Sequence, residues 1–360
     1  MYQGLWRSIV GVAGLIVSAL VSGCAPPPAC SSTAPELTDI DFTRVNTAVD
    51  LADDVTQLNM GLKTEADLRQ RWERPGISLE FRNVSGNPYT YMLFTDDWQQ
   101  VQAIVLPGTT RPQEWRADFM IGLVYDEVLG INLHEGWRLA AQAVGRDVFP
   151  QLKPDYSLYI YGYSLGAGTG AILGLYMDRV LGVQVREIIA SGMPRVTDAA
   201  GAATFNAMPL LRLAAGNDTI PFFPPAPYVT CGDVLVLLDG QFCSRQLPGD
   251  PDYDNEPTTV DQIAQLNPED HVTYVQRMAD KVGVPVCFIP YENRQSYIGQ
   301  EADAGLSYVH RGSAPAGAVG LRWRCNDDMR PERSDGDRPC GRTQCGSSRP
   351  GSAAGGSWAI

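Results

Sequence analysis

One stretch of the chain predicts a strand, a sharp turn and a helix, and it reads YSLYIYGYSLGAGTGAILGLYMDRV over residues 156–180. Residues 156–161 form a short aromatic and aliphatic run, which is typical of a buried strand. Residues 165–180 are mostly small or apolar and contain no proline, which favours a helix packed on a sheet. Between them, residues 162–166 read GYSLG, a G-x-S-x-G motif in the strand–turn–helix context of a nucleophile elbow.

This motif has a physical rationale that makes Ser164 a candidate nucleophile. The serine has to stand on a tight, strained turn so that its hydroxyl projects from the sheet edge. A side chain at Gly162 or Gly166 would collide with the neighbouring strand or helix. The amide of Leu165, at the start of the helix, could then donate to an oxyanion. The alternative is a serine in an ordinary turn, so partner residues elsewhere must decide.

Composition sets broad limits on the fold and the function. The chain has 360 residues, of which 44% are hydrophobic and 19% are charged, enough to bury one large core. The formal net charge of -13 argues against nucleic acid as a partner. The sequence has three His and no C-x-x-C pair, so we expect neither a metal site nor a cofactor.

The N-terminus predicts export. Residues 8–21 form an apolar run too short for a comfortable membrane span, and they lead into LVSGC, which ends at Cys24. This ending resembles the lipobox of bacterial lipoproteins. The resemblance implies a signal peptide over residues 1–23, lipidation of Cys24, an anchor in a bacterial membrane and transport to the outer membrane. The alternative is an ordinary secretory peptide cleaved near Ala25, which would give a secreted or periplasmic protein.

Export also permits disulfides among the eight cysteines. Cys231 and Cys243 are close in sequence, and we predict that they form a local pair. The pairing of Cys30 and Cys287 stays open.

Predicted strands alternate with predicted helices, which indicates an α/β fold with a mainly parallel sheet covered by helices on both faces. Residues 24–40 are predicted to be a Pro- and Ser-rich tether, 41–311 the folded domain, and 312–360 a low-complexity, disordered tail. The expected elements are helical spacing over 41–72, a hairpin of strands 89–94 and 101–106, a helix from 133 to about 144, strands 185–190, 210–214 and 234–238, and a helix over 272–278.

A serine nucleophile needs a histidine base, and the elbow predicts that this base follows the serine in the chain. Only His271 and His310 do so. His310 lies at the edge of the low-complexity tail, whereas His271 opens an apolar helix, so we favour His271. His134 precedes the elbow, and we expect it to be a buried structural residue.

The carboxylate that orients the base is harder to choose. Asp218 follows a strand end, where the active sites of α/β sheets lie, and it is our choice. Asp198 lies in a helix-capping context, and Asp233 could be a turn residue. For the oxyanion hole, Gly108 and Thr109 follow an earlier strand and could supply the second donor.

Six motifs in order resemble the class 3 lipases, the fungal-lipase type of α/β-hydrolase, over roughly residues 85 to 285. The motifs are Gly108-Thr109 with Trp115 and Asp118, His134-x-Gly136-Trp137, the GYSLG elbow, Gly192-Met193-Pro194-Arg195-Val196, Asn217-Asp218 with Pro221, Pro224 and Pro225, and Asp270-His271 with Tyr274.

The resemblance implies a catalytic triad of Ser164, Asp218 and His271, the same three that the residues themselves suggest. It also implies oxyanion donors at Thr109 and Leu165.

The resemblance further implies a lid region over residues 110–118, which includes Trp115 and Asp118. The chain departs from the family pattern at three places: Tyr163 replaces a histidine, Leu106-Pro107 replaces Phe-Arg, and Gly166-Ala167 replaces Gly-Gly. None of these departures removes a catalytic atom.

We therefore expect a monomeric serine hydrolase that cleaves carboxylic esters of lipids, as a triacylglycerol lipase or esterase does, through an acyl-enzyme. A phospholipase, a polyester hydrolase or an acyltransferase would use the same triad. A non-catalytic surface lipoprotein with a vestigial elbow is the alternative outside the enzymes, and an intact Ser, Asp and His argues against it.

Overall fold

The structure is a computed structural model, and it describes residues 39–84, 90–109, 122–250, 253, 259 and 268–298. Cys24 with the predicted signal peptide, most of the predicted tether and the predicted tail lie outside the described residues, as do Trp115, Asp118 and His310. Predictions about those segments stay predictions.

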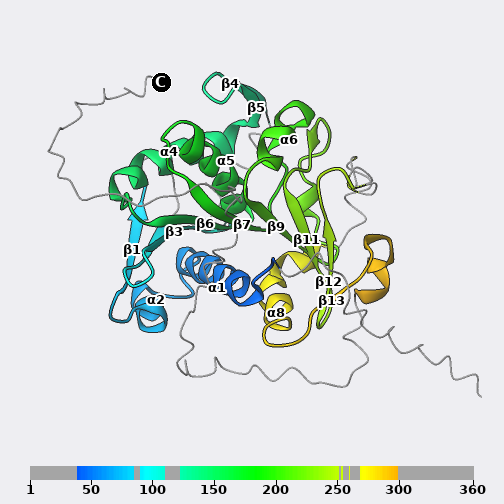
Figure 1. Ribbon diagram of the computed structural model, residues 1–360, viewed down its shortest axis with the longest axis horizontal. Helices are drawn as coiled ribbons and strands as arrows, with labels where there is room; N and C mark the ends of the chain where they lie inside the picture. The colour runs from blue at the N-terminus through cyan, green and yellow to red at the C-terminus, as the bar shows by residue number, and fades with distance from the viewer. Residues whose placement is uncertain are drawn as a thin grey trace, which may run out of the picture. The chain divides into compact units, whose positions relative to one another are not determined.

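Within the described residues, a nine-stranded sheet forms the centre of the fold, in the order β1-β2-β3-β6-β7-β9-β11-β12-β13 (Figure 1). Strands β3, β6, β7, β9 and β11 pair in parallel. Strands β1, β2 and β3 pair antiparallel on one side, and β12 pairs antiparallel with β11 on the other. This confirms the predicted mainly parallel sheet and the hairpin that leads into it. The strands are Ile77–Asn83 (β1), Thr90–Asp96 (β2), Val101–Leu106 (β3), Ser157–Tyr163 (β6), Val185–Ser191 (β7), Leu210–Ala215 (β9), Asp233–Leu237 (β11), Phe242–Gln246 (β12) and Cys287–Phe288 (β13).

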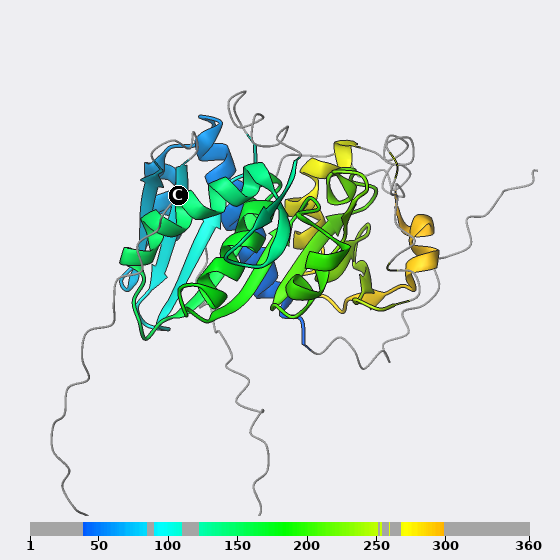
Figure 2. The ribbon, with the colours of Figure 1, turned by 90° about the horizontal axis from the view of Figure 1, so that it is seen from above.

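Helices cover both faces of this sheet, as predicted. Helices α4 and α5 lie on one face and α1 and α8 on the other, and each pair buries a separate apolar cluster against the strands. Figure 2 shows the same layers from above, with α4 and α5 on the viewer's side of the nine-stranded sheet. The helices are Phe42–Asn59 (α1), Glu65–Trp72 (α2), Glu135–Val148 (α4), Leu165–Arg179 (α5), Ala199–Asn206 (α6) and Tyr274–Ala279 (α8), with short 3₁₀ helices at Phe149–Gln151, Ile220–Phe222, Pro268–Val272 (η4) and Tyr291–Tyr297.

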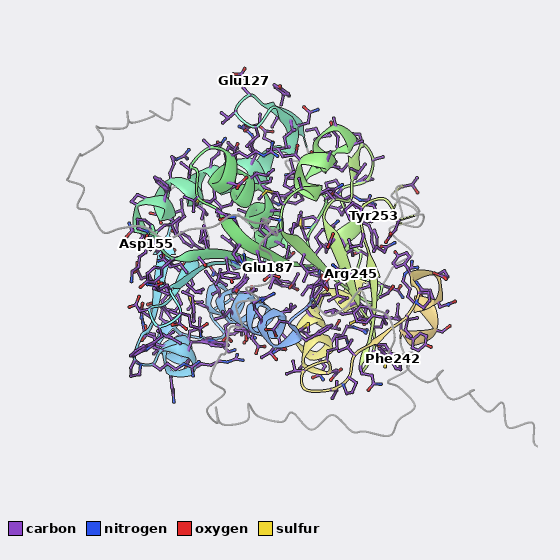
Figure 3. All side chains as sticks on the ribbon, viewed as in Figure 1. Glu127, Asp155, Glu187, Phe242, Arg245 and Tyr253 are labelled. Atoms are coloured by element: carbon purple, nitrogen blue, oxygen red, sulfur yellow. The ribbon has the colours of Figure 1, made fainter. Side chains whose placement is uncertain are left out.

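Helix α1 is tied to the sheet by charge as well as by apolar contact. Glu187 on β7 points toward α1 (Figure 3) and forms an ion pair with Arg44 at 2.8 Å. The helical spacing over 41–72 corresponds to two helices and not one, because Gly61 takes a left-handed φ of 75° just after α1 ends. Thr64 and Asp67 then form a capping box that starts α2.

A second, antiparallel sheet with the order β10-β8-β5-β4 was not expected from the sequence. Its strands contain between two and four residues, too few to show an alternating pattern. They are Leu123–Asp126 (β4), Ile131–His134 (β5), Thr197–Asp198 (β8) and Tyr228–Val229 (β10).

The predicted disulfide between Cys231 and Cys243 is wrong, since both residues are buried thiols. Cys231 precedes β11, whereas Cys243 pairs with Leu237 at the far end of β11. The strand separates them by about 13 Å, at 3.3 Å per residue, and a disulfide tolerates a Cα–Cα distance of only about 7 Å. They also belong to clusters on opposite faces of the sheet.

Candidate active site

Ser164 stands on a strained turn between β6 and α5. Its φ of 53° and ψ of -120° lie in a region that side-chain-bearing residues rarely adopt. The amide of Ser164 donates to the carbonyl oxygen of Ser191 at 2.8 Å, which fixes the turn against β7. The turn has the geometry that the G-x-S-x-G motif predicted.

The two glycines of the motif are required by close backbone contacts. A Cβ on Gly162 would lie 2.5 Å from the carbonyl oxygen of Gly166, and a Cβ on Gly166 would lie 2.4 Å from that of Pro107. Neither neighbour is a flexible side chain that could move away. Helix α5 therefore begins directly against the end of β3, and Leu165, its first residue, has an amide without an intrahelical acceptor.

The structure brings His271 and Asp218 together, although 53 residues separate them. His271 lies on η4, and its Nδ1 is 2.8 Å from Oδ2 of Asp218, which follows β9. Two further groups donate to this carboxylate: the amide of Ile220 at 2.9 Å and the hydroxyl of Tyr274 at 2.7 Å. Burial, together with Asp218, raises the pKa of Tyr274 well above its usual value, so its hydroxyl stays protonated and remains a donor.

The loops that carry Asp218 and His271 are also joined beside the pair. Asn217 precedes Asp218, and Asp270 precedes His271. The amide of Asn217 donates to Oδ2 of Asp270 at 2.7 Å, which joins the two loops. Arg277 on α8 lies 3.5 Å from the same Asp270 carboxylate. These contacts fix the distance between the two loops.

Tyr163, which stands where the family has a histidine, holds the base from the other side. Its hydroxyl donates to the carbonyl oxygen of His271 at 2.7 Å, and its ring stacks on the imidazole at a centroid distance of 4.9 Å. A Cβ on Gly192 would lie 2.8 Å from Cε1 of His271, so the first glycine of the G-x-P-R-V motif leaves room for the imidazole. Sequence reasoning noted Tyr163 only as a departure and missed its contact with His271.

The predicted oxyanion loop lies beside the serine. A Cβ on Gly108 would be 3.4 Å from Cβ of Ser164 and 2.6 Å from the Tyr163 ring, so only glycine fits there. The amide of Gly108 donates to Oγ1 of Thr56 on α1 at 3.0 Å. Thr56 therefore holds the loop through this amide, and the next residue, Thr109, lies in the lining of the cavity that contains Ser164.

One cavity of about 580 Å³ contains Ser164, His271 and Thr109 in its lining, a volume within the usual range for small-molecule sites. Most of the other lining side chains are apolar, and they are Val49, Met60, Leu165, Pro194, Ile220, Phe223, Val272 and Val275.

Helix α1 forms one wall of this cavity, which sequence reasoning missed. Val49, Asp53, Thr56 and Met60 follow helical spacing, so they share one face of α1. That spacing is a signal in the sequence, but nothing in it shows that this face meets the elbow.

The rejected candidates have structural roles. His134 is fully buried, its Nδ1 accepts from the amide of Trp137 at 3.4 Å, and it stacks on that indole. Asp198 caps α6 by accepting from the amide of Gly201 at 3.0 Å. Asp233 begins β11 and forms an ion pair with Arg245.

Two kinds of feature are absent from the described part of the chain. None of its helices is long and apolar enough to cross a membrane. In the same residues, no group of three or more His, Cys, Asp and Glu side chains is arranged to hold a metal ion.

Comparison with known proteins shows that part of this chain is similar to one protein family. Residues 103–228 match the model of the class 3 lipases. The chloroplastic phospholipase A1 PLIP2 of Arabidopsis thaliana is 21% identical to this chain over 146 residues, a match that covers 39% of this chain. The match spans only 19% of the length of that phospholipase.

Two solved lipase structures are similar to this chain. A triacylglycerol lipase with a serine protease triad as its catalytic centre matches with a TM-score of 0.50 and 20% identity, over 66% of this chain and 95% of that one. The triacylglyceride lipase of Rhizomucor miehei matches with a TM-score of 0.46 and 20% identity, over 65% of this chain and 92% of that one. The first likeness confirms the predicted α/β-hydrolase fold.

Proposed function

We propose that this protein hydrolyses carboxylic esters of lipids, with Ser164 as nucleophile, His271 as base and Asp218 as the orienting carboxylate. The observation that carries the proposal is the strained elbow at Ser164, which shares an apolar cavity with a His271–Asp218 hydrogen bond of 2.8 Å. The match of residues 103–228 to the class 3 lipases supports the same chemistry.

The hydrogen bond between His271 and Asp218 determines which nitrogen of the imidazole acts as the base in the proposed reaction. Nδ1 of His271 is bonded to Asp218, so Nε2 takes the proton of Ser164 as the hydroxyl attacks the acyl carbonyl. Donors from Thr109 and Leu165 stabilise the tetrahedral intermediate. The leaving alcohol takes the proton from Nε2, and water, activated by the same imidazole, then hydrolyses the acyl-enzyme.

Apolar cavity walls favour an ester with a long hydrocarbon part, because burying apolar surface contributes about 25 cal/mol per Å². A phospholipase is the second candidate, because the PLIP2 relative is a phospholipase A1. A polyester hydrolase or an acyltransferase would use the same three residues, and substrate profiling separates these activities from one another.

We also propose that lipidation of Cys24 anchors the protein to a bacterial membrane, on the LVSGC ending alone. Replacing Cys24 with Ser should move the protein from the membrane fraction to the soluble fraction. Unchanged fractionation would reject the anchor and leave the proposed chemistry untouched.

The test of the activity is hydrolysis of p-nitrophenyl esters across acyl lengths, with wild type beside Ser164→Ala. We expect turnover by wild type, none by the variant, and an acyl-length optimum that separates an esterase from a lipase. If wild type also fails on emulsified triacylglycerol with detergent, the enzyme proposal is wrong and the surface-lipoprotein interpretation replaces it.

A further inference from the structure

The catalytic cavity contains an acid that the proposed reaction does not use. Asp53, on α1, lines the cavity together with Ser164 and His271. Its side chain is partly exposed, and the wall around it is largely apolar. A carboxyl group in such a wall has lost part of its water, so the group needs a partner.

Among the residues that the structure describes, the two neighbouring acids of α1 have cationic partners, and Asp53 has none. Asp54 accepts from Arg71, Lys63 and the indole of Trp72, and Asp50 forms an ion pair with Arg71 at 2.9 Å. For Asp53, the one hydrogen bond found within the described residues comes from the side-chain amide of Gln57, and no cation in those residues lies within ion-pair distance.

The electrostatics of Asp53 agree with its place in the wall. Burial raises the pKa of Asp53, and the more distant Lys63 and Arg71 do not offset that effect. Burial, followed by Asp218 and then by Asp53, raises the pKa of Tyr163, whose side chain lines the same cavity.

Helix geometry places Asp53 close to the reacting centre. Thr56, which holds the amide of Gly108 in the oxyanion loop, lies three residues further along α1. At 1.5 Å per residue, Asp53 is about 4.5 Å along the helix from the level of that loop. On the same face, Met60 is 55% exposed and Val49 is 3% exposed, so Asp53 lies between the open and the buried end of the wall.

We propose that Asp53 is a polar subsite that binds a hydroxyl group carried by the substrate, a few bonds from the scissile ester. Esters with such a group include partial glycerides on the alcohol side and hydroxyacyl esters on the acyl side. This inference rests on the proposed function and narrows its substrate class.

The chemistry at Asp53 separates three kinds of substrate group. A methyl or methylene group would displace water from the Asp53 carboxyl without replacing the hydrogen bonds that the water donates, which is unfavourable. A hydroxyl replaces that water and donates to the free positions of the carboxyl oxygens. An anionic group would be repelled by the ionised carboxyl, and no cation of the described wall compensates for it.

Two pairs, each of an unsubstituted ester and its hydroxyl-bearing analogue, test the subsite, and one 6-carboxy ester is added as an anionic probe. On the acyl side, p-nitrophenyl hexanoate is compared with its 6-hydroxy and 6-carboxy analogues. On the alcohol side, propyl butyrate is compared with the butyrate monoester of ethylene glycol by pH-stat titration. We expect wild type to favour the hydroxyl-bearing member of at least one pair by about tenfold in kcat/KM, and to disfavour the carboxylate.

Variants assign this preference to Asp53. Asp53→Leu should abolish or reverse the hydroxyl preference, and Asp53→Asn should keep a weaker one while accepting the carboxylate more readily. Asp50→Asn is the matched control, because Asp50 lies on the same helix outside the cavity lining, and its ratios should equal those of wild type. Each ratio is taken within one preparation, so a partly unfolded variant does not distort it.

Identical ratios in wild type and Asp53→Leu for both pairs would overturn the subsite. In that case, turnover of the unsubstituted esters would still support the proposed function. Absence of turnover on every ester by wild type would instead overturn the proposed function itself. Which pair responds identifies the part of the ester that carries the hydroxyl.

Discussion

Thr56 is a buried residue of α1. Its replacement by Val should lower kcat, although Ser164, His271 and Asp218 are unchanged. Its Oγ1 accepts from the amide of Gly108 at 3.0 Å and donates to the carbonyl oxygen of Ala52 at 2.7 Å. Valine keeps the shape and removes the acceptor, which leaves the Gly108 amide unsatisfied at a cost of about 1–3 kcal/mol. The loop can regain a hydrogen bond only by moving, and Thr109 moves with it.

The expected size of the effect follows from the role of the loop. Removing an oxyanion donor outright lowers kcat by about 10²–10³, and displacing a catalytic group by about 1 Å costs up to about 10². We therefore expect Thr56→Val to lower kcat by about 10- to 100-fold, which corresponds to about 1.4–2.7 kcal/mol. KM should change little, because the apolar wall that binds the substrate is intact.

The assay is p-nitrophenyl butyrate hydrolysis, with active sites counted by titration with a phosphonate that labels Ser164, and with thermal unfolding measured in parallel. Thr56→Ser keeps the hydroxyl and should restore most of the activity. Thr47→Val is the matched control, since the Thr47 hydroxyl donates to the carbonyl oxygen of Thr43 on the same helix at 3.0 Å. If Thr56→Val and Thr47→Val give the same kcat per titrated site, the loop does not depend on Thr56 and the reasoning fails.

Three further changes test the site. Tyr163→Phe removes the hydrogen bond to His271 but keeps the stacked ring, so kcat should fall by about 2- to 10-fold, and an unchanged kcat would show that stacking alone holds the base. Gly166→Ala places a Cβ against backbone at 2.4 Å, so it should destabilise the fold by more than about 4 kcal/mol in urea unfolding, and near-wild-type stability would contradict the close contact. Burial raises the pKa of Asp53 above its ordinary value of 3.8, so the folded protein binds the proton of this carboxyl more tightly than the unfolded chain does. Ionisation of Asp53 therefore lowers the free energy of unfolding as pH rises through the folded pKa. Asp53→Asn should therefore have a higher Tm than wild type at pH 7, and this difference in Tm should vanish below pH 3.8. A difference in Tm of equal size at both pH values would contradict the raised pKa.

The sequence predicted those parts of the fold whose signal is local. The run before Ser164 is apolar because β6 is buried between other strands, and the glycines beside the serine are required by contacts within a few residues of the turn. The hairpin and the parallel strands were predicted for the same reason. Chain order left two histidines open, and the choice of His271 and Asp218 rested on the composition of the tail and on the strand end before Asp218. The structure joins these two residues by a hydrogen bond.

The missed features depend on contacts between distant parts of the chain. Nothing near Thr56 in the sequence indicates that its hydroxyl meets Gly108, 52 residues later. The strands of the second sheet are too short to show a period. The pairing of Cys231 with Cys243 failed because closeness in sequence says nothing of the strand that separates them.

The segment that matches the class 3 lipases supplies only part of the cavity lining. Ser164, Asp218 and Thr109 lie within residues 103–228, whereas His271, α1 and α8 lie outside that segment. The elbow and the loop tolerate almost no change at Gly162, Gly166 or Gly108, whereas Asp53 and Met60 on the α1 wall are partly or largely exposed, so exchanging them has little effect on the sheet. Substitutions at Asp53 or Met60 should therefore change substrate preference at constant kcat for an unsubstituted ester, while substitutions at Gly162, Gly166 or Gly108 lower kcat for every ester alike.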